Sequence, residues 1–101
     1  MAKIVAAAIK FRPKSSDYFQ IMCGKRHCHV FEVMYKLGIE YDKLTHVQGF
    51  LTDEDQFIDR YEAAEMAFRS GQLSQDTELW KKMNEDKDSF FAYQLFSEDL
   101  W

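Results

Sequence analysis

Three residue types are scarce in this sequence of 101 residues: it has four glycines, two cysteines and one proline. This composition excludes a low-complexity chain and a disulfide-dense secreted domain, and we expect both cysteines to be reduced. No stretch approaches the roughly 18 apolar residues that a membrane-spanning helix needs. Lys3, Lys10 and Arg12 interrupt the apolar N-terminal stretch, which therefore lacks the pattern of a signal peptide. We expect a cytoplasmic protein without a membrane partner.

Positive charge is also in short supply, since the net charge is −4. A protein that wraps duplex nucleic acid usually presents a broad basic face, and we expect no such partner here. The two halves differ, however: residues 1–50 carry a net +4 and residues 51–101 a net −8. The local basic surplus suits a small anion better than a long polymer.

Aromatic residues are abundant, with nine Phe, five Tyr and two Trp in a sequence that is 47% hydrophobic. So much apolar surface excludes a disordered chain, and the length suits a single domain over residues 1–101. A domain of this size has limited interior for so many rings, so some are expected between subunits. We therefore expect a homo-oligomer, either a dimer or a larger assembly.

The hydrophobic pattern predicts alternating strands and helices. Together they indicate an α+β fold with a small antiparallel sheet of about four to five strands packed against two or three helices. The expected strands are 2–12, 18–23, 45–52, 57–58 and 91–96, and the expected helices are 27–37, 59–71 and one within 74–89.

Local signals mark the ends of these elements. Asp59 followed by Glu62 is a capping-box pattern, and Gly38 and Gly71 supply left-handed exits from the first and second helices. Gly49 falls inside a predicted strand, where a glycine commonly marks a bulge or the close approach of another backbone or a ligand.

The segment Gly24-Lys25-Arg26-His27 places basic residues at a helix start, which is already electropositive. One interpretation is that these residues and the free amides of the helix bind an anion such as phosphate. The other is that they point into solvent or pair with acidic residues, at small cost. The P-loop pattern GxxxxGK[ST] is absent.

Metal binding and catalysis are less favoured. His27, Cys28 and His29 are consecutive and radiate about 100° apart on a helix, so they cannot share one ion. Buried cysteines and a packed or hydrogen-bonded histidine are the expected explanation. A cysteine could pair with a histidine as a nucleophile, but nothing orders a triad. We assign no catalytic residue and no metal ligand.

Rings that could stack on a base are the remaining candidates. Most Phe in a small domain belongs to the core, so only a ring beside Arg26, Arg60 or Gly49 merits a ligand role. The candidates are Phe50, Tyr61, Tyr93, Phe96 and Trp101.

Four segments occur together: GKRH (24–27), QGFLT (48–52), FIDRYEAAEMA (57–67) with GQL (71–73), and LFSEDLW (95–101). In this combination the sequence resembles a family of small phage and prophage proteins, the Thoeris anti-defence sponges, which sequester cyclic ADP-ribose isomers made by bacterial TIR enzymes. The resemblance covers most of the chain except residues 74–91, which look like a variable charged insertion.

The resemblance implies a non-enzymatic protein without a cofactor that acts in the infected bacterial host. It would hold a cyclic ADP-ribose-type signal of the glycocyclic kind, or a cyclic oligonucleotide, in pockets between subunits. Chemistry then suggests the site residues: Arg26 and His27 on phosphate, Arg60 as a second phosphate clamp, Gln48 and Gly49 where the ligand approaches backbone, and Phe50 or Phe96 for stacking. The alternatives are a nucleotide-processing hydrolase and a phage interaction protein without a ligand.

Overall fold

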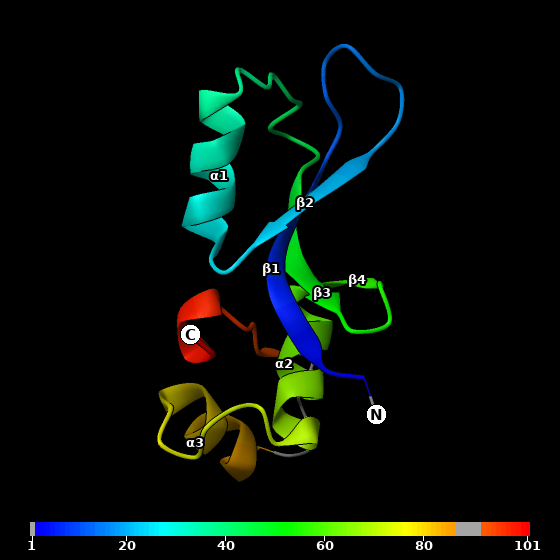
Figure 1. Ribbon diagram of the computed structural model, residues 1–101. Coiled ribbons are helices and arrows are strands. Elements are labelled where there is room, and N and C mark those ends of the chain that lie inside the picture. The colour runs from blue at the N-terminus through cyan, green and yellow to red at the C-terminus, as the bar shows by residue number, and fades with distance from the viewer. Residues whose placement is uncertain (1, 87–91) are drawn as a thin grey trace.

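The computed structural model describes residues 2–86 and 92–101. In chain order its elements are β1 (Ile4–Phe11), β2 (Gln20–Gly24), α1 (His27–Lys36), β3 (Val47–Thr52), β4 (Phe57–Asp59), α2 (Arg60–Ser70), α3 (Glu78–Glu85) and the 3-10 helix η2 (Ser97–Asp99). The molecule is elongated, about 45 Å long and 23 Å wide, with α1 at one end and α3 at the other (Figure 1).

The strands form one antiparallel sheet in the order β2-β1-β3-β4. The predicted α+β fold with an antiparallel sheet is therefore confirmed. Residues that pair directly across antiparallel strands point to the same face. Ala7, Phe50 and Ile58 consequently share one face, because Ala7 pairs with Phe50 and Phe50 with Ile58.

Both α1 and α2 pack on this same face. Towards one end of β1, Ile9 and Phe11 form a buried cluster with Val30 and Met34 of α1. Towards the other end, Ala7 and Phe50 belong to a larger cluster with three alanines of α2, Met83 of α3 and Leu95 of the C-terminal segment. Small alanine side chains let α2 lie close to the sheet.

The opposite face of the sheet carries the alternate residues of the strands. Ala8, Lys10, Ile21, Val47, Leu51 and Phe57 lie on it, as their cross-strand pairing requires. None of them belongs to either buried cluster of the described residues, and Ile21 and Val47 expose 46% and 40% of their surface. This face, called the open face below, is without a helix layer in the part of the chain that the structure describes.

The predicted helix ends are present. The Asp59 carboxylate accepts a hydrogen bond from the Glu62 amide at 2.8 Å, which is the N-cap half of the predicted capping box. Gly38 and Gly71 follow α1 and α2 with φ of 68° and 80°, the left-handed conformation that glycine adopts without strain. Helix α3 begins after its N-cap Thr77; residues 87–89 of the predicted 74–89 segment lie outside the described residues.

The strand predicted over 91–96 is wrong for residues 92–96, whereas residue 91 lies outside the described part. Its backbone finds other partners. The Leu95 amide donates to the Arg60 carbonyl at 2.9 Å, and the Phe96 amide donates to the Asp99 carboxylate at 2.9 Å. Leu95 is fully buried in the larger cluster, so the apolar run docks a turn against α2 and does not extend the sheet.

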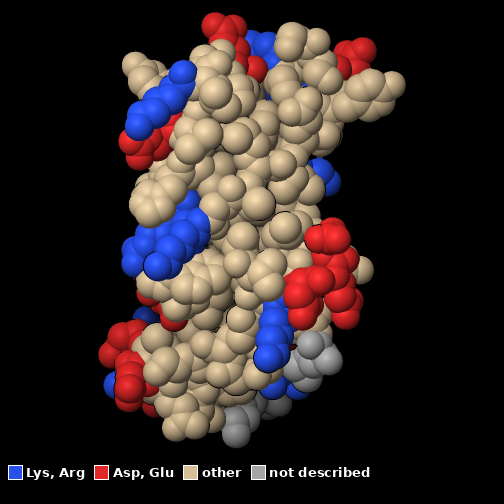
Figure 2. Space-filling model, viewed as in Figure 1, with Lys and Arg blue, Asp and Glu red and all other residues tan. Residues whose placement is uncertain are grey.

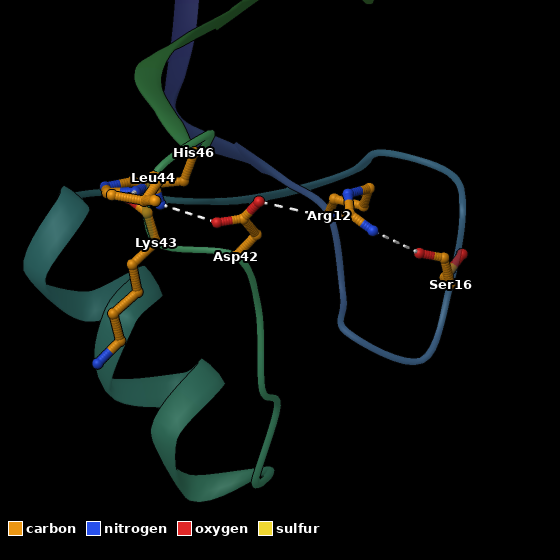
Figure 3. A network of polar contacts seen from close by, with 6 residues as sticks. All are labelled: Arg12, Ser16, Asp42, Lys43, Leu44 and His46. Carbon is orange, nitrogen blue, oxygen red and sulfur yellow. Dashed lines mark hydrogen bonds and ion pairs between the residues drawn. The ribbon is translucent and has the colours of Figure 1, made fainter.

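A polar network joins the loop after β1 to the connector after α1 (Figure 3). Arg12 donates to the Ser16 carbonyl and pairs with the Asp42 carboxylate at 3.3 Å. The second oxygen of Asp42 accepts from the Leu44 amide, and this hydrogen bond is the main reason that the pKa of Asp42 is below 3.8. The network orders this end of the molecule.

Candidate functional site

Arg60, the first residue of α2, is the centre of the candidate site. Its Nη2 donates to Oε1 of Gln48 at 2.6 Å, and the guanidinium carbon lies 4.4 Å from the centre of the Phe96 ring. Its Nε is buried and has no hydrogen-bond partner among the described residues. Arg60 thus combines a cation–π contact with an incompletely satisfied guanidinium.

Three elements bring these side chains together. Gln48 comes from β3, Arg60 follows directly from β4, and Phe96 arrives from the C-terminal segment. The pairing of Gly49 with Asp59 aligns the first two, because it sets Gln48 beside the start of α2. The hydrogen bond from the Leu95 amide to the Arg60 carbonyl places the next residue, Phe96, beside Arg60.

His27 forms a second, adjacent group. It is buried, its Nε2 lies 2.6 Å from the Gly49 carbonyl oxygen, and its ring meets that of Phe50 edge-on with centroids 5.0 Å apart. Because a carbonyl oxygen only accepts, Nε2 must carry the proton and donate it. His27 therefore ties the start of α1 to β3.

Charges connect the two groups. Burial is the main reason that the pKa of His27 is below 6.5, and the nearby positive charge of Arg60 lowers this pKa further. The hydrogen bond to the Gly49 carbonyl and the negative charge of Glu98 act in the opposite direction and raise it. Burial also lowers the pKa of Arg60, and Glu98 again opposes the effect. Glu98 of η2 is thus the carboxylate whose charge acts on both His27 and Arg60.

Arg26 lies at the N-cap of α1, where it makes no side-chain cap. Its guanidinium instead donates to the main-chain oxygen of Trp101. In Figure 2, Lys and Arg atoms gather over the start of α1, at the left of the view beside the C-terminal segment. Two of the three basic residues in this segment, Arg26 and His27, therefore already have carbonyl partners within the protein.

The seven residues expected from the sequence all lie in this one region, but they differ in accessibility. Gln48, Arg60 and Phe96 surround one guanidinium, and Phe96 is 43% exposed. Phe50 is 0% exposed, so its ring has no free face on which a base could stack. Gly49 approaches another backbone rather than open space: an added Cβ would lie 2.1 Å from the Ile58 carbonyl oxygen.

The sequence pattern assigned Glu98 no role in the site, and it indicated Trp101 only as a ring that could stack on a base. Both lie in LFSEDLW, one of the segments that carry the resemblance. The Glu98 charge acts on Arg60, about 40 positions earlier in the chain, and the Trp101 carbonyl accepts from Arg26, 75 positions earlier. No local sequence signal reports a separation of that length.

Two shallow pockets flank the segment before η2. One, of about 340 Å³, is lined by His46, Val47, Gln48, Asp59, Arg60, Tyr61 and Gln94. The other, of about 350 Å³, is lined by Leu79, Lys82, Ala92, Tyr93, Gln94, Phe96 and Asp99. Gln94 lines both pockets, so the two pockets adjoin at this residue.

Other chemistry is not assembled in the described residues. Over 2–86 and 92–101, no three His, Cys, Asp or Glu side chains lie close enough together to hold a metal ion. Cys23 and Cys28 are free and exposed, contrary to the expectation of buried cysteines. In the same ranges, no helix is both long enough and apolar enough to cross a membrane.

The buried His27 predicts a pH dependence of stability. Its folded-state pKa is below the 6.5 of an exposed histidine, so the unfolded chain binds more protons as pH falls below about 6.5. The contribution of His27 to the free energy of unfolding is therefore complete above pH 6.5 and declines below it. Urea unfolding at pH 7.5 and 5.5 measures how much the free energy of unfolding decreases between these pH values. This decrease should be smaller in His27→Gln than in the wild type. It should be unchanged in His29→Gln, the control, because His29 is exposed. If the free energy of unfolding of His27→Gln decreased as much as that of the wild type, His27 would not be the source of the pH dependence.

Comparison with known proteins places the chain in a family. No curated protein and no solved structure matches it. The model of a family described as Phage T4 y16D protein matches residues 3–101. The match includes β3, the start of α2 and the C-terminal segment, which together build the Arg60 site. The chain therefore belongs to the phage T4 y16D protein family.

Proposed function

We propose that this phage protein binds a small phosphorylated nucleotide of the cyclic ADP-ribose class and sequesters it without cleaving it, thereby inhibiting TIR-based Thoeris defence. The observation that carries the proposal is the environment of Arg60. A guanidinium with an unsatisfied nitrogen lies beside an amide oxygen and an exposed aromatic ring. Guanidinium groups bind phosphate through paired hydrogen bonds, and aromatic rings stack on bases.

The size of the pockets supports a site that is completed by another subunit. Pockets for small ligands usually have volumes of about 300 to 1,000 Å³. The pocket beside Arg60, at about 340 Å³, is at the low end and suits only part of a nucleotide. This agrees with the between-subunit pockets that the sequence resemblance implies.

The C-terminal segment competes with the ligand for the same cations. Glu98 acts on Arg60 by its charge, and the Trp101 carbonyl accepts from Arg26. A phosphate that binds Arg26 or Arg60 must replace or join these contacts. We therefore expect the segment from Phe96 to Trp101 to shift when a nucleotide binds.

Substitution of Arg60 tests the site. Arg60→Gln should weaken binding of cyclic ADP-ribose isomers about 10- to 150-fold in isothermal titration, because a charge-assisted contact contributes about 1.5 to 3 kcal/mol. Glu98→Gln should strengthen binding, since it removes the competing charge. Arg69→Gln, which changes an exposed arginine at the other end of α2, is the matched control and should bind as the wild type does. Equal affinity in wild type and Arg60→Gln would remove the proposed site.

The fate of the ligand separates a sponge from an enzyme. The protein is incubated with a glycocyclic ADP-ribose isomer and then heat-denatured, and the supernatant is examined by mass spectrometry. Intact ligand, released in proportion to protein, supports sequestration; a converted product supports the nucleotide-processing hydrolase instead. If neither cyclic ADP-ribose isomers nor cyclic dinucleotides raise the melting temperature, the protein has no such ligand, because a ligand that binds only the folded form must stabilise it.

A further inference from the structure

The strand β2 forms an edge of the sheet. It pairs with β1 on one side, and in the described part of the chain no other strand lies beside it (Figure 1). An edge strand presents unpaired backbone donors and acceptors along its outer side, and soluble proteins usually protect such edges with charged residues, proline or bulges.

Strand β2 has none of these protections. Its sequence, QIMCG, contains no charged residue and no proline, and its pairing with β1 is regular over all five residues. Ile21 is 46% exposed on the open face, and Phe19, just before the strand, is 48% exposed. The edge and the part of the open face that β1 and β2 form are therefore apolar apart from Lys10, whose ammonium lies over the Phe19 ring.

The residues at the two ends of β2 carry opposite charges. Asp17 precedes the strand, and Lys25 and Arg26 follow it. A second copy that pairs antiparallel with this edge is turned by 180°, which brings the acidic end of each strand to the basic end of the other. This charge complementarity favours a second copy of the chain as the occupant.

We propose that two copies of the chain pair antiparallel through β2 to form a continuous eight-stranded sheet. A two-fold axis at Ile21 places this side chain opposite its own copy and brings Asp17 near Lys25 of the partner subunit. Both open faces then lie on one side of the joint sheet, and all helices lie on the other.

The position of α1 agrees with this arrangement. Helix α1 lies over β1 and β2, so with strands about 4.8 Å apart the two copies of α1 would be about 10 Å from each other. Packed helices are typically separated by about 8 to 10 Å. Val33 and Leu37, which are 45% and 65% exposed at α1, supply apolar side chains for such a contact.

Mass measurement of the full chain tests the interface. We expect light scattering to report a dimer at micromolar concentration and Ile21→Lys to convert it to a monomer, because the axis would place two ammonium groups together. Asp17→Lys and Lys25→Asp should each raise the dimer dissociation constant about 2- to 30-fold, and the double variant should restore it. A wild type that is monomeric, or a dimer that Ile21→Lys leaves unchanged, would overturn the proposal.

Cross-linking tests the register independently of stability. In a background with Cys23→Ser and Cys28→Ser, Ile21→Cys should give a covalent dimer with a short bis-maleimide, because directly opposed Cβ atoms lie about 4.5 to 5.5 Å apart. Leu44→Cys is the matched control and should remain monomeric on a denaturing gel: Leu44 is 95% exposed and precedes β3, which β1 separates from β2. Equal cross-linking of both variants would overturn the proposed axis. The mass and cross-linking measurements involve no nucleotide. Their results therefore test the β2 interface separately from nucleotide binding.

Discussion

Gly49→Ala is expected to destabilise the protein by about 3 kcal/mol or more, which is at the top of the usual range for overpacking. An added Cβ would lie 2.1 Å from the Ile58 carbonyl oxygen and 2.7 Å from Cζ of Phe57. The nearest atom belongs to the backbone of β4, which is held by its pairing with β3 and cannot rotate away as a side chain would. Strand β4 leads into the Asp59 cap and Arg60, so the change should also disturb the candidate site.

Thermal unfolding followed by circular dichroism measures this effect. A loss of about 3 kcal/mol corresponds to a decrease in Tm of about 12 to 24 °C in a domain of this size. Gly24→Ala is the matched control: its nearest neighbour is a side-chain carbon of Val30 at 3.2 Å, which can adjust, so a much smaller decrease is expected. A Gly49→Ala protein with a Tm within a few degrees of wild type would show that β4 can move aside.

Phe50→Ala and Phe96→Ala should separate stability from binding. Phe50 is fully buried among Ala7, Ile58 and the alanines of α2, and truncation of such a ring costs about 3 to 5 kcal/mol. Phe96 is 43% exposed and lies against the Arg60 guanidinium, so Phe96→Ala should cost far less stability. If Phe96 stacks on a base, Phe96→Ala should weaken nucleotide binding by about 1 to 3 kcal/mol, the usual contribution of such a contact.

Urea unfolding and nucleotide titration of both variants provide the readouts. The expected pattern is a large shift in the unfolding midpoint for Phe50→Ala and a large shift in affinity for Phe96→Ala. A Phe50→Ala protein that keeps wild-type stability but loses binding would mean that Phe50, and not Phe96, is the stacking residue. Such a result would require β3 to expose this face when the ligand binds.

Local chemistry was sufficient to predict most of the elements. Alternation and turn residues located β1 and β2, and helical spacing located α1. Asp59, Gly38 and Gly71 marked helix ends correctly because a capping side chain or a left-handed glycine acts within a few residues of its own position. The run before η2 was misassigned as a strand because its apolar residues are equally suited to docking a turn, and only the carbonyl of Arg60 decided between the two.

The candidate site was predictable as a set of residues but not as an arrangement. Charge and residue type selected Arg26, Arg60, Gln48 and Phe96, and the structure brings Gln48 and Phe96 to Arg60. The same reasoning could not distinguish Phe50 from Phe96, since the residue type is the same and the sequence does not report which ring is buried. Burial separates them, and burial depends on which side of the sheet the helices cover.

Composition and local pattern are enough to establish an α+β chain with a basic first half, an acidic second half and more aromatic surface than a small core holds. Three features became known from the folded chain alone: α1 and α2 cover one face of the sheet, His27 donates to the Gly49 carbonyl, and the C-terminal segment contacts Arg26 and Arg60. These two kinds of feature differ in the sequence separation over which the interactions act. Propensity, capping and alternation act over a few neighbouring residues, whereas these contacts join positions that are brought together only when the whole chain folds.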